Sequence, residues 1–330
     1  MTEFQTWPKA ELHVHLDGSL RPKTVWELAR SSRIRLPFDS LAELTRHLRV
    51  PRRCTLPQYL QAFQHTVAVM QEREHLQRVA HEFLEDVAQD GVRYVEVRFA
   101  PSLHGRGGLT MEQITEAVLA GLQEGQRKTG VIARLICCAM RQEPPALSEA
   151  VARVAVQYRL AGVVALDLAG PEVGYPAEPH RKAFEYALEN DLHLTLHAGE
   201  ACCPDNVVRA MDLGAHRIGH GTFICRDERV AKRVADSKIP LEVCPTSNLQ
   251  ISGFIDDYAA HPLHQYLRAG MWVTLNTDNR LMSNVTLSDE FAHLSATLSQ
   301  EILRRIARNG LEAAFLPTQE KQRLLDEWFA

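Results

Sequence analysis

The sequence predicts an α/β protein of the TIM (β/α)8 barrel class, and two features of the chain support this prediction. Eight apolar runs have the length of strands, and segments with helical periodicity separate most of them. Alternating strands and helices indicate a parallel sheet, and eight strands favour a closed barrel over a doubly wound sheet. The predicted strands are Leu12–Leu16, Val92–Phe99, Ile132–Ala139, Val163–Leu168, Leu192–Ala198, Arg217–Gly221, Leu241–Cys244 and Trp272–Asn276.

Helices are predicted after the second, third, fourth and sixth strands and again at the C-terminus. The connecting helices are Met111–Lys128, Leu147–Arg159, His180–Glu189 and Glu228–Asp236. The extra C-terminal helices are Leu287–Ala296, Gln300–Asn309 and Thr318–Phe329. No internal repeat, linker or low-complexity tract interrupts the sequence, so we expect residues 1–330 to form a single domain.

One interval departs from the alternation, because a long stretch separates the first predicted strand from the second. Periodicity predicts several helices within it, at Thr24–Ser31, Leu41–Leu48, Leu56–Met70 and Arg73–Gln89. We expect this insertion, about residues 22–90, to lie over the mouth of the barrel as a candidate lid.

The composition narrows the classes of partner. With 330 residues, 45% hydrophobic and 24% charged, the chain has the makeup of a globular protein with a large core. A formal net charge of −4 does not favour nucleic acid, and no apolar run approaches the length of a membrane span. The N-terminal residues lack the pattern of a signal peptide. The cysteine count of 7 is odd and includes two adjacent pairs, which favours free thiols in a reducing cytoplasm.

Two histidines alternate along the first predicted strand, in the segment AELHVHLDGSL. Side chains two residues apart on a strand point to the same side, so His13 and His15 face one way and Val14 faces the other. If the strand belongs to a barrel, both imidazoles project inward near its carboxyl end. Taken alone, the pattern fits surface or core histidines equally well.

A second polar pair follows the fifth predicted strand, in LTLHAGE. A buried histidine at the end of an apolar strand needs a polar partner, which draws attention to His197. Gly199 permits a tight turn that directs Glu200 back over the mouth of the barrel. The alternative reading is a core histidine followed by a surface glutamate.

His220 and Asp278 follow the sixth and eighth predicted strands, in RIGHGT and VTLNTDN. Glycines flank His220, and because glycine weakens a strand we expect it where the backbone must let a ligand come close. Ordinary turns with solvated side chains are the alternative for both segments.

These segments gain significance together, because all lie at the carboxyl ends of the first, fifth, sixth and eighth predicted strands. That face is where barrel enzymes form their active sites. Histidines combined with a carboxylate suit a divalent metal, most often zinc. An open position on zinc lowers the pKa of a bound water to about 7, which supplies hydroxide at neutral pH.

An ordered set of motifs resembles the adenosine deaminase branch of the amidohydrolase superfamily, from about Lys9 to Phe315. The motifs are HVHLDGSLRP, DLAGPE, HAGE, RIGHGT, CPTSN and NTDN. The resemblance implies a hydrolase with one zinc per chain. The implied zinc ligands are His13, His15, His197 and Asp278, and the implied substrate contacts are His15, Asp17, Gly170 and Asn279.

The resemblance also implies the reaction, which is zinc-dependent hydrolytic deamination of adenosine or 2′-deoxyadenosine to inosine or 2′-deoxyinosine plus ammonia. Glu200 is the implied proton donor to purine N1, and His220 orients the attacking water and assists its deprotonation. The chemistry agrees, since an acid beside N1 removes the charge that attack at C6 places on the ring. Glu200 therefore needs a raised pKa in a dry pocket. The implied partner is a small purine nucleoside, bound by a monomer or homodimer.

Within the substrate contacts, the resemblance places Asp17 at the ribose 5′-hydroxyl and Gly170 at purine N3. Asn279 departs from the family, because many members have a second aspartate at this position. An asparagine can donate to N7 and accept from the 6-amino group, the pattern it uses on adenine edges. Ala100 is a second departure, since some members have a serine there, and its loss weakens contact on the sugar side.

These departures leave the 5′ specificity open. Some relatives deaminate 6-aminodeoxyfutalosine, a 5′-modified adenosine with an anionic 5′ group, and this substrate is the main alternative. Arg141, just past the third predicted strand, is a candidate contact for its carboxylate. The competing reading of Arg141 is a rim arginine paired with a nearby acid.

Other classes of zinc protein fit less well. The zinc deaminases with H-x-E and P-C-x-x-C motifs are excluded because the chain contains no C-x-x-C. The fourth predicted strand ends without the lysine that bridges two metals in binuclear amidohydrolases, which favours one metal. Cys202 and Cys203 follow Glu200, and we expect them to pack in the loop. A catalytically inactive relative that binds nucleosides is a further alternative, which the complete set of chemical residues disfavours.

Overall fold

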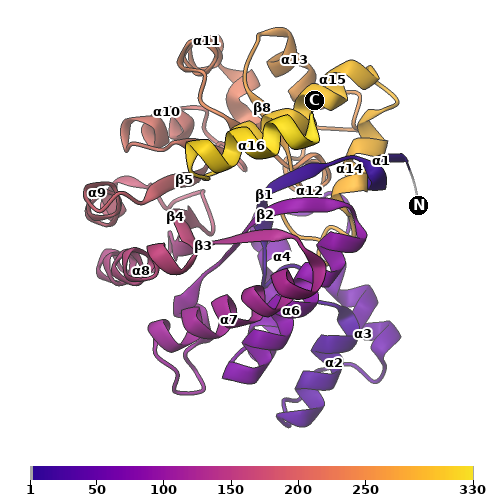
Figure 1. Cartoon of the computed structure of the whole chain (residues 1–330), viewed down its shortest axis with the longest axis vertical. Coiled ribbons are helices and arrows are strands. Elements are labelled where there is room, and N and C mark those ends of the chain that lie inside the picture. The colour runs from indigo at the N-terminus through magenta and orange to yellow at the C-terminus, as the bar shows by residue number, and fades with distance from the viewer. Residues whose placement is uncertain (1–2, 330) are drawn as a thin grey trace.

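Eight parallel strands close into a barrel, which confirms the predicted fold. A computed structural model describes residues 3–329, and within them the strands follow one another in sheet order (Figure 1). They are β1 Lys9–His15, β2 Val92–Phe99, β3 Ile132–Met140, β4 Val163–Ala169, β5 His193–Ala198, β6 Arg217–His220, β7 Leu241–Val243 and β8 Val273–Leu275. The barrel closes where His15 N donates to Asp278 O at 2.7 Å and Asp278 N donates to His13 O at 2.9 Å.

The strand boundaries differ from the prediction most clearly in β1, which begins at Lys9 rather than at Leu12. Lys9 and Glu11 are charged, yet both side chains are fully buried. Glu11 Oε2 pairs with Arg280 Nη1 at 3.0 Å, and Lys9 Nζ donates to backbone carbonyls of the preceding turn. Burial is therefore possible because a distant arginine pairs with Glu11 and nearby backbone carbonyls accept from Lys9.

The insertion between β1 and β2 is helical, as predicted, and contains α2 Pro22–Ser31, α3 Leu41–Leu48, α4 Leu56–Gln61, α5 Phe63–Val69 and α6 Arg73–Gln89. The single predicted helix Leu56–Met70 is wrong, because the chain breaks at Ala62 into α4 and α5. The two helices have different neighbours: Tyr59 of α4 packs with Ile251 and Met282, whereas Val69 of α5 belongs to the main core. Helix α6 packs against β2 and against the first helix after it, so the departure from the barrel plan is confined to α2–α5.

The outer layer contains the predicted helices α7 Met111–Thr129, α8 Pro145–Gln157, α9 Arg181–Glu189 and α11 Glu228–Ser237. Short helices that the sequence analysis missed are α1 Glu3–Thr6, α10 Asp205–Asp212, α12 Pro245–Ile251 and α13 Leu263–Arg268. Pro245 is the first residue of α12, and Pro204 and Pro262 directly precede α10 and α13. Proline favours the first turn of a helix, so this signal was present in the sequence although the apolar periodicity was too short to show.

The C-terminal helices are α14 Leu287–Leu294, α15 Gln300–Glu312 and α16 Thr318–Trp328. Helix α15 packs against β1 and β8, and α16 crosses the barrel (Figure 1). Leu324 and Leu325 of α16 belong to one apolar cluster with Leu12 and Tyr94 of the strands. This cluster closes the amino ends of the strands and leaves the carboxyl ends free for a site. No helix within residues 3–329 combines the length and apolarity needed to cross a membrane.

Candidate active site

The carboxyl ends of β1, β5, β6 and β8 bring the predicted chemical residues together. His15 Nε2 lies 3.2 Å from His197 Nε2 and 3.5 Å from Asp278 Oδ1. His13 Nε2 also lies 3.5 Å from Asp278 Oδ1. One ligand atom each from His13, His197, His220 and Asp278 fall within 4.8 Å of one another. These residues form the histidine cluster, defined as His13, His15, His197, His220 and Asp278.

A bulge in β1 directs His13 into the barrel. The pairing with β2 shifts register between Glu11 and Val14, and the Asn276 side chain fills the gap. Asn276 Oδ1 accepts hydrogen bonds from Leu12 N at 2.8 Å and from His13 N at 3.1 Å. Bulges re-aim side chains beside functional sites. Val14 consequently packs in the outer core while His13 faces inward, as the alternation along the strand predicts.

The glycines around His220 have a different purpose from the one the sequence suggested. A Cβ on Gly219 would lie 3.0 Å from His13 Cε1 and 3.2 Å from His197 Cα, so Gly219 makes room for a histidine of the cluster. Gly221 has φ 67° and His220 itself has φ 66°, both left-handed. The interpretation that the flanking glycines admit a ligand is therefore wrong, because neighbouring protein atoms occupy the space.

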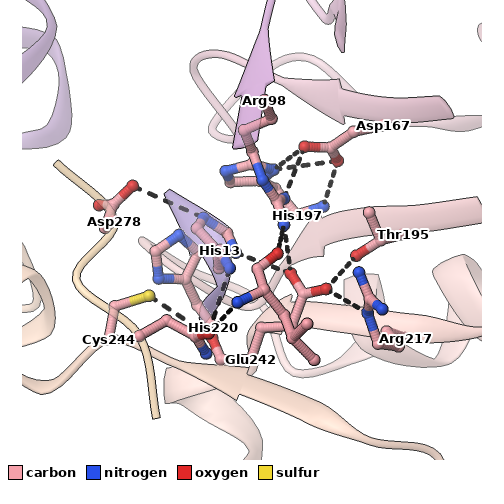
Figure 2. Close-up of polar contacts among 12 residues, drawn as sticks. His13, Arg98, Asp167, Thr195, His197, Arg217, His220, Glu242, Cys244 and Asp278 are labelled. Carbon is pink, nitrogen blue, oxygen red and sulfur yellow. Dashed lines mark hydrogen bonds and ion pairs between the residues drawn. The ribbon is translucent and has the colours of Figure 1, made fainter. Parts of the chain in front are cut away.

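Buried carboxylates behind the cluster hold two of its histidines (Figure 2). His13 Nδ1 lies 2.8 Å from Glu242 Oε2, and His197 Nδ1 lies 2.9 Å from Asp167 Oδ2. Arg98 joins both carboxylates at 2.8 Å. A carboxylate partner keeps the proton on Nδ1 and leaves the Nε2 lone pair for a metal. Burial by itself raises the pKa of Glu242, but Arg98 and Arg217 hold that pKa well below its usual range.

The same network continues below the cluster through Arg217. Its guanidinium pairs with Glu96 at 2.5 Å and with Glu242 at 2.6 Å, while Thr195 Oγ1 donates to Glu242 Oε1 at 2.8 Å. We call Glu96, Arg98, Asp167, Thr195, Arg217 and Glu242 the interior network. The sequence analysis missed it, although Glu96 and Arg98 alternate with apolar residues along a buried strand.

The histidine cluster fits a divalent metal. Ligand atoms about 2.1 Å from a tetrahedral zinc lie about 3.4 Å from one another. Three pairs match this spacing: His15 with His197 at 3.2 Å, and Asp278 with His13 and with His15 at 3.5 Å each. The group whose ligand atoms all lie within 4.8 Å of one another has His220 in place of His15. His13 Nε2 is buried without a hydrogen-bond partner among the described residues. Burial lowers the pKa of His15 to about 3, so this imidazole is neutral, as a ligand must be. The cluster has one more histidine than this set requires.

Glu200 reaches the cluster through a turn that another glutamate organises. Gly199 has φ 63°, as the predicted tight turn requires. Glu172, in the loop after β4, accepts from the backbone of Gly199 at 2.6 Å and of Glu200 at 3.0 Å. Burial raises the pKa of Glu200 well above its ordinary value, and the charges of Asp278 and Glu172 raise it further. The sequence analysis quoted the motif DLAGPE but missed this function of Glu172.

A cavity above the cluster contains the predicted substrate residues. His15, Asp17, Gly170, Glu200 and Asn279 all line it. Asp17 Oδ1 and Asn279 Oδ1 are buried and have no hydrogen-bond partner in residues 3–329. Gly170 has φ 96°, and a Cβ there would lie 2.4 Å from Gln142 Oε1. Unpaired acceptors in a cavity wall are available to a ligand.

The insertion supplies one wall of this cavity, in agreement with its predicted place over the mouth. Leu56, Tyr59 and Leu60 of α4 and Phe63 of α5 line the cavity. Tyr59 is buried and hydrogen-bonds through its hydroxyl to Ser283 Oγ at 2.7 Å. The prediction that the insertion closes as a lid remains a prediction.

The remaining candidates lie at the edge of the site. Arg141 Nη1 donates to Tyr175 O at 3.1 Å and Nη2 donates to His197 O, so the pairing with a rim acid is not observed. Ala100 lines the cavity. Cys202 is partly buried in the loop, as expected, but Cys203 is exposed.

Ser247 and Asn248 belong to the motif CPTSN at the start of α12, and the sequence analysis assigned them no function. Ser247 Oγ donates to Asp278 Oδ2 at 2.6 Å, which leaves Asp278 Oδ1 facing His13 and His15. Asn248 contacts His220. The motif therefore orients two members of the cluster.

Known proteins resemble this chain along nearly its whole length. The sequence profile named Adenosine deaminase matches residues 8–329. An adenosine deaminase of Clostridium kluyveri is 38% identical over 327 residues, covering 98% of this chain and 94% of the relative. One of Enterococcus faecalis is 40% identical over 320 residues, covering 96% of this chain and 94% of the relative.

Solved structures with the same architecture are also deaminases or amidohydrolases. An adenine deaminase from Arthrobacter aurescens has TM-score 0.90 and 29% identity, covering 97% of this chain and 98% of its own. An N6-methyl-AMP deaminase from Arabidopsis thaliana has TM-score 0.87 and 28% identity, covering 98% of this chain and 97% of its own. An amidohydrolase from Burkholderia ambifaria with bound zinc has TM-score 0.89 and 25% identity, covering 99% of this chain and 92% of its own. The chain therefore belongs to the adenosine deaminase family and is a hydrolytic deaminase.

Proposed function

We propose that the protein deaminates adenosine and 2′-deoxyadenosine with one zinc ion per chain, releasing ammonia and leaving inosine or 2′-deoxyinosine. The observation that carries this proposal is one cavity that borders the histidine cluster through His15, His197 and Asp278 and is lined by a buried acid and unpaired acceptors for a purine nucleoside. The relatives named adenosine deaminase support the reaction. Two solved neighbours are an adenine deaminase and an N6-methyl-AMP deaminase, whose substrates differ at the sugar and phosphate end. The substrate of this chain at that end is therefore inferred from the cavity residues.

His13, His15, His197 and Asp278 would hold the zinc, which when bound activates water as a nucleophile at neutral pH. Glu200 remains protonated because burial raises its pKa, and it donates that proton to purine N1 as the ring becomes electron-rich. His220 Nε2 lies 3.7 Å from Glu200 Oε1, so His220 orients the attacking water beside the acid. Glu200 thus supplies the proton to the ring, and His220 holds the water that attacks it.

The purine is recognised by Asn279 and Gly170. Asn279 is 2% exposed, and its unpaired Oδ1 accepts from the 6-amino group while Nδ2 donates to N7. Gly170 presents backbone to N3, since a side chain at φ 96° is strained and would meet Gln142. This pattern selects a 6-aminopurine over a 6-oxopurine.

The sugar end favours an uncharged 5′-hydroxyl. Asp17 presents an unpaired carboxylate oxygen that accepts from a hydroxyl and repels a phosphate or carboxylate. The cation considered for an anionic 5′ group, Arg141, donates to two backbone carbonyls instead. Adenosine and 2′-deoxyadenosine are therefore better supported than 6-aminodeoxyfutalosine or a 5′-nucleotide.

A substrate panel tests the proposal. Purified protein is assayed for ammonia release with adenosine, 2′-deoxyadenosine, adenine, methylthioadenosine, AMP and 6-aminodeoxyfutalosine, and kcat/KM is compared. The two nucleosides with a free 5′-hydroxyl should rank highest. A higher kcat/KM for an anionic 5′ substrate would overturn the substrate assignment. Bound nucleoside without ammonia release would instead identify an inactive relative.

Metal analysis and native mass spectrometry complete the test. We expect about one zinc per chain, by analogy with single-metal catalytic sites. Mass spectrometry distinguishes the monomer from the homodimer that we propose as alternatives. The free thiols of the described cysteines support a reducing, cytoplasmic location, which a localised fluorescent fusion would check.

A further inference from the structure

A chain of buried polar side chains leads from the start of α13 to His220. Leu263 N donates to His261 Nδ1 at 3.0 Å, and His261 Nε2 lies 3.3 Å from Asn248 Oδ1. Asn248 Nδ2 lies 3.1 Å from His220 Nδ1. His261 is 2% exposed and Asn248 is 1% exposed, so bulk water does not compete for these contacts.

The first contact determines the direction of all the others. A backbone N–H only donates, so His261 Nδ1 must accept and its ring proton must be on Nε2. Burial lowers the pKa of His261 to about 3, so the ring carries a single proton. That proton is donated to Asn248 Oδ1, which leaves the Asn248 amide NH₂ to donate to His220 Nδ1. His220 Nδ1 accepts this hydrogen bond and so bears no hydrogen, which places the ring hydrogen on Nε2.

We propose that Asn248 and His261 are positioning residues that fix His220 as the Nε2–H tautomer. In this tautomer His220 Nε2 carries a hydrogen and no lone pair, and it lies 3.7 Å from Glu200 Oε1. His220 therefore orients the attacking water by donating a hydrogen bond, and the expectation that it also takes a proton from the water is not part of this proposal. His13 and His197 have the opposite arrangement, because carboxylates hold the proton on their Nδ1 atoms. We call the hydrogen-bonded series His261, Asn248 and His220 the relay. It gives His220 a different tautomer from the histidines that would bind the metal. The catalytic consequence rests on the proposed function, whereas the tautomer does not.

Nitrogen-15 NMR of the zinc-loaded full chain reads the proton position directly. Histidine labelled at both ring nitrogens gives separate signals for N–H and bare nitrogens, and comparison with His220→Gln assigns the His220 pair. We expect a proton on Nε2 and none on Nδ1 in the wild type. A His220 signal with the proton on Nδ1 in the wild type overturns the proposal.

The variant Asn248→Asp should reverse the tautomer, because an ionised aspartate accepts from Nδ1 and cannot donate to it. A proton should appear on His220 Nδ1, and kcat should fall about 10²–10³-fold, the loss that follows removal of one hydrogen-bond donor from an active site. Zinc content should stay near that of the wild type, since the ligands remain. A His220 that keeps a bare Nδ1 in this variant contradicts the relay.

His261 provides a conservative pair of variants. Gln at this position retains an N–H donor for Asn248, so His261→Gln should keep the tautomer and most activity. His261→Leu removes the donor and should cost about 10–100-fold in kcat, as other outer-shell partners do. If thermal melting shows that both variants are folded and their kcat values are equal, the relay is contradicted. If His261→Leu does not fold, His261→Gln and Asn248→Asp still decide the outcome.

His264, which lies on α13 three residues after His261, gives a matched control. Its Nε2 contacts Tyr258 O at 2.9 Å and lies outside the relay. His264→Gln should leave the His220 signals and kcat unchanged. Since the NMR result does not depend on which nucleoside is deaminated, a failed substrate panel and a failed relay are distinguishable.

Discussion

The interior network below the histidine cluster and the cavity above it are both buried and polar, yet they satisfy their polar atoms differently. In the network, Glu242 accepts from His13, Arg98, Arg217 and Thr195. In the cavity, Asp17 Oδ1 and Asn279 Oδ1 lack a partner within the described chain. A buried polar atom left unpaired costs about 1–3 kcal/mol.

This difference separates residues that support the site from residues that bind. The network saturates its carboxylates and so sets the orientation of two ligand histidines at the base of the cavity. The cavity leaves acceptors open in positions that a nucleoside hydroxyl or amine would complete. The unpaired acceptors Asp17 Oδ1 and Asn279 Oδ1 thus distinguish the cavity from the network, whose own unpaired atom, Arg98 Nε, is a donor.

The largest expected effect is on turnover, from a change in the cavity that leaves the network intact. Glu200→Gln removes the acid but none of the proposed metal ligands, so kcat should fall about 10²–10⁴-fold. Atomic absorption should find zinc content unchanged. A variant with near wild-type kcat shows that Glu200 is not the proton donor.

The corresponding change in the network should act on stability. Glu242→Gln leaves Arg98 and Arg217 without a shared anion, and breaking such buried pairs costs about 3–5 kcal/mol. Urea denaturation measures the free energy of unfolding. The surface variant Asp256→Asn removes the exposed partner of Arg53 and serves as the control, with little change expected. If both variants lose a similar free energy of unfolding, the buried network contributes no more to stability than a surface ion pair.

The pH dependence of stability should have opposite signs for two buried glutamates. Glu290 accepts from Thr246 N at 3.0 Å, and burial raises its pKa to about 8. Because the folded pKa lies above the unfolded value, its favourable contribution is complete below about pH 4.5 and is lost as pH rises toward 8, by up to about 1.4 kcal/mol per pH unit. Glu290→Gln should therefore flatten the loss of stability between these values in urea titrations.

Glu242 gives the opposite sign, since its pKa is lowered on folding. Its stabilisation is present above the unfolded pKa, about 4.3, and is lost as pH falls toward the lowered folded pKa. Glu242→Gln should be less sensitive to acid than the wild type. Parallel acid profiles for the two proteins would contradict the assigned shift.

A smaller effect is expected at the sugar end of the cavity. Asp17→Asn weakens a hydrogen bond to an ionised acceptor, worth about 1.5–3 kcal/mol, so kcat/KM for adenosine should fall about 10–100-fold. The same substitution should reduce kcat/KM much less for a nucleoside that lacks the 5′-hydroxyl. If adenosine and 5′-deoxyadenosine are affected equally, Asp17 does not contact the 5′-hydroxyl.

The smallest effect is expected from Asn279→Asp. A protonated aspartate can also donate to N7, so kcat and KM for adenosine should change only modestly. Steady-state kinetics near neutral pH checks this. Identical constants in both proteins would indicate that residue 279 does not touch the substrate.

The barrel and the approximate place of its site were predictable because both follow from local patterns. Strand and helix periodicities are short-range, and residues after parallel strands meet at one face whatever their separation in sequence. The break at Ala62 was not predictable, because it depends on neighbours such as Met282 that only the fold supplies.

The interior network marks the limit of the sequence analysis. Arg98, Asp167 and Glu242 come from different strands, so their mutual pairing has no local signature, although each is a charge within an apolar strand. The flanking glycines of His220 were misinterpreted for the same reason, since the His13 ring that Gly219 accommodates lies far away in sequence. Motif resemblance proposed the ligands but not the side chains that orient them.

The candidate metal site lies at the joint where the first and last strands of the barrel meet, so a bound metal would also stabilise the closed barrel. His13 and His15 lie on one side of the joint between the first and last strands, and Asp278 lies on the other. Asn276 already bridges this joint over a sequence separation of 264 residues. An ion held by both sides would act as a clasp for the whole barrel, because binding only the closed state stabilises it by mass action. Hydrogen exchange should then speed up first along this joint when the ion is withdrawn.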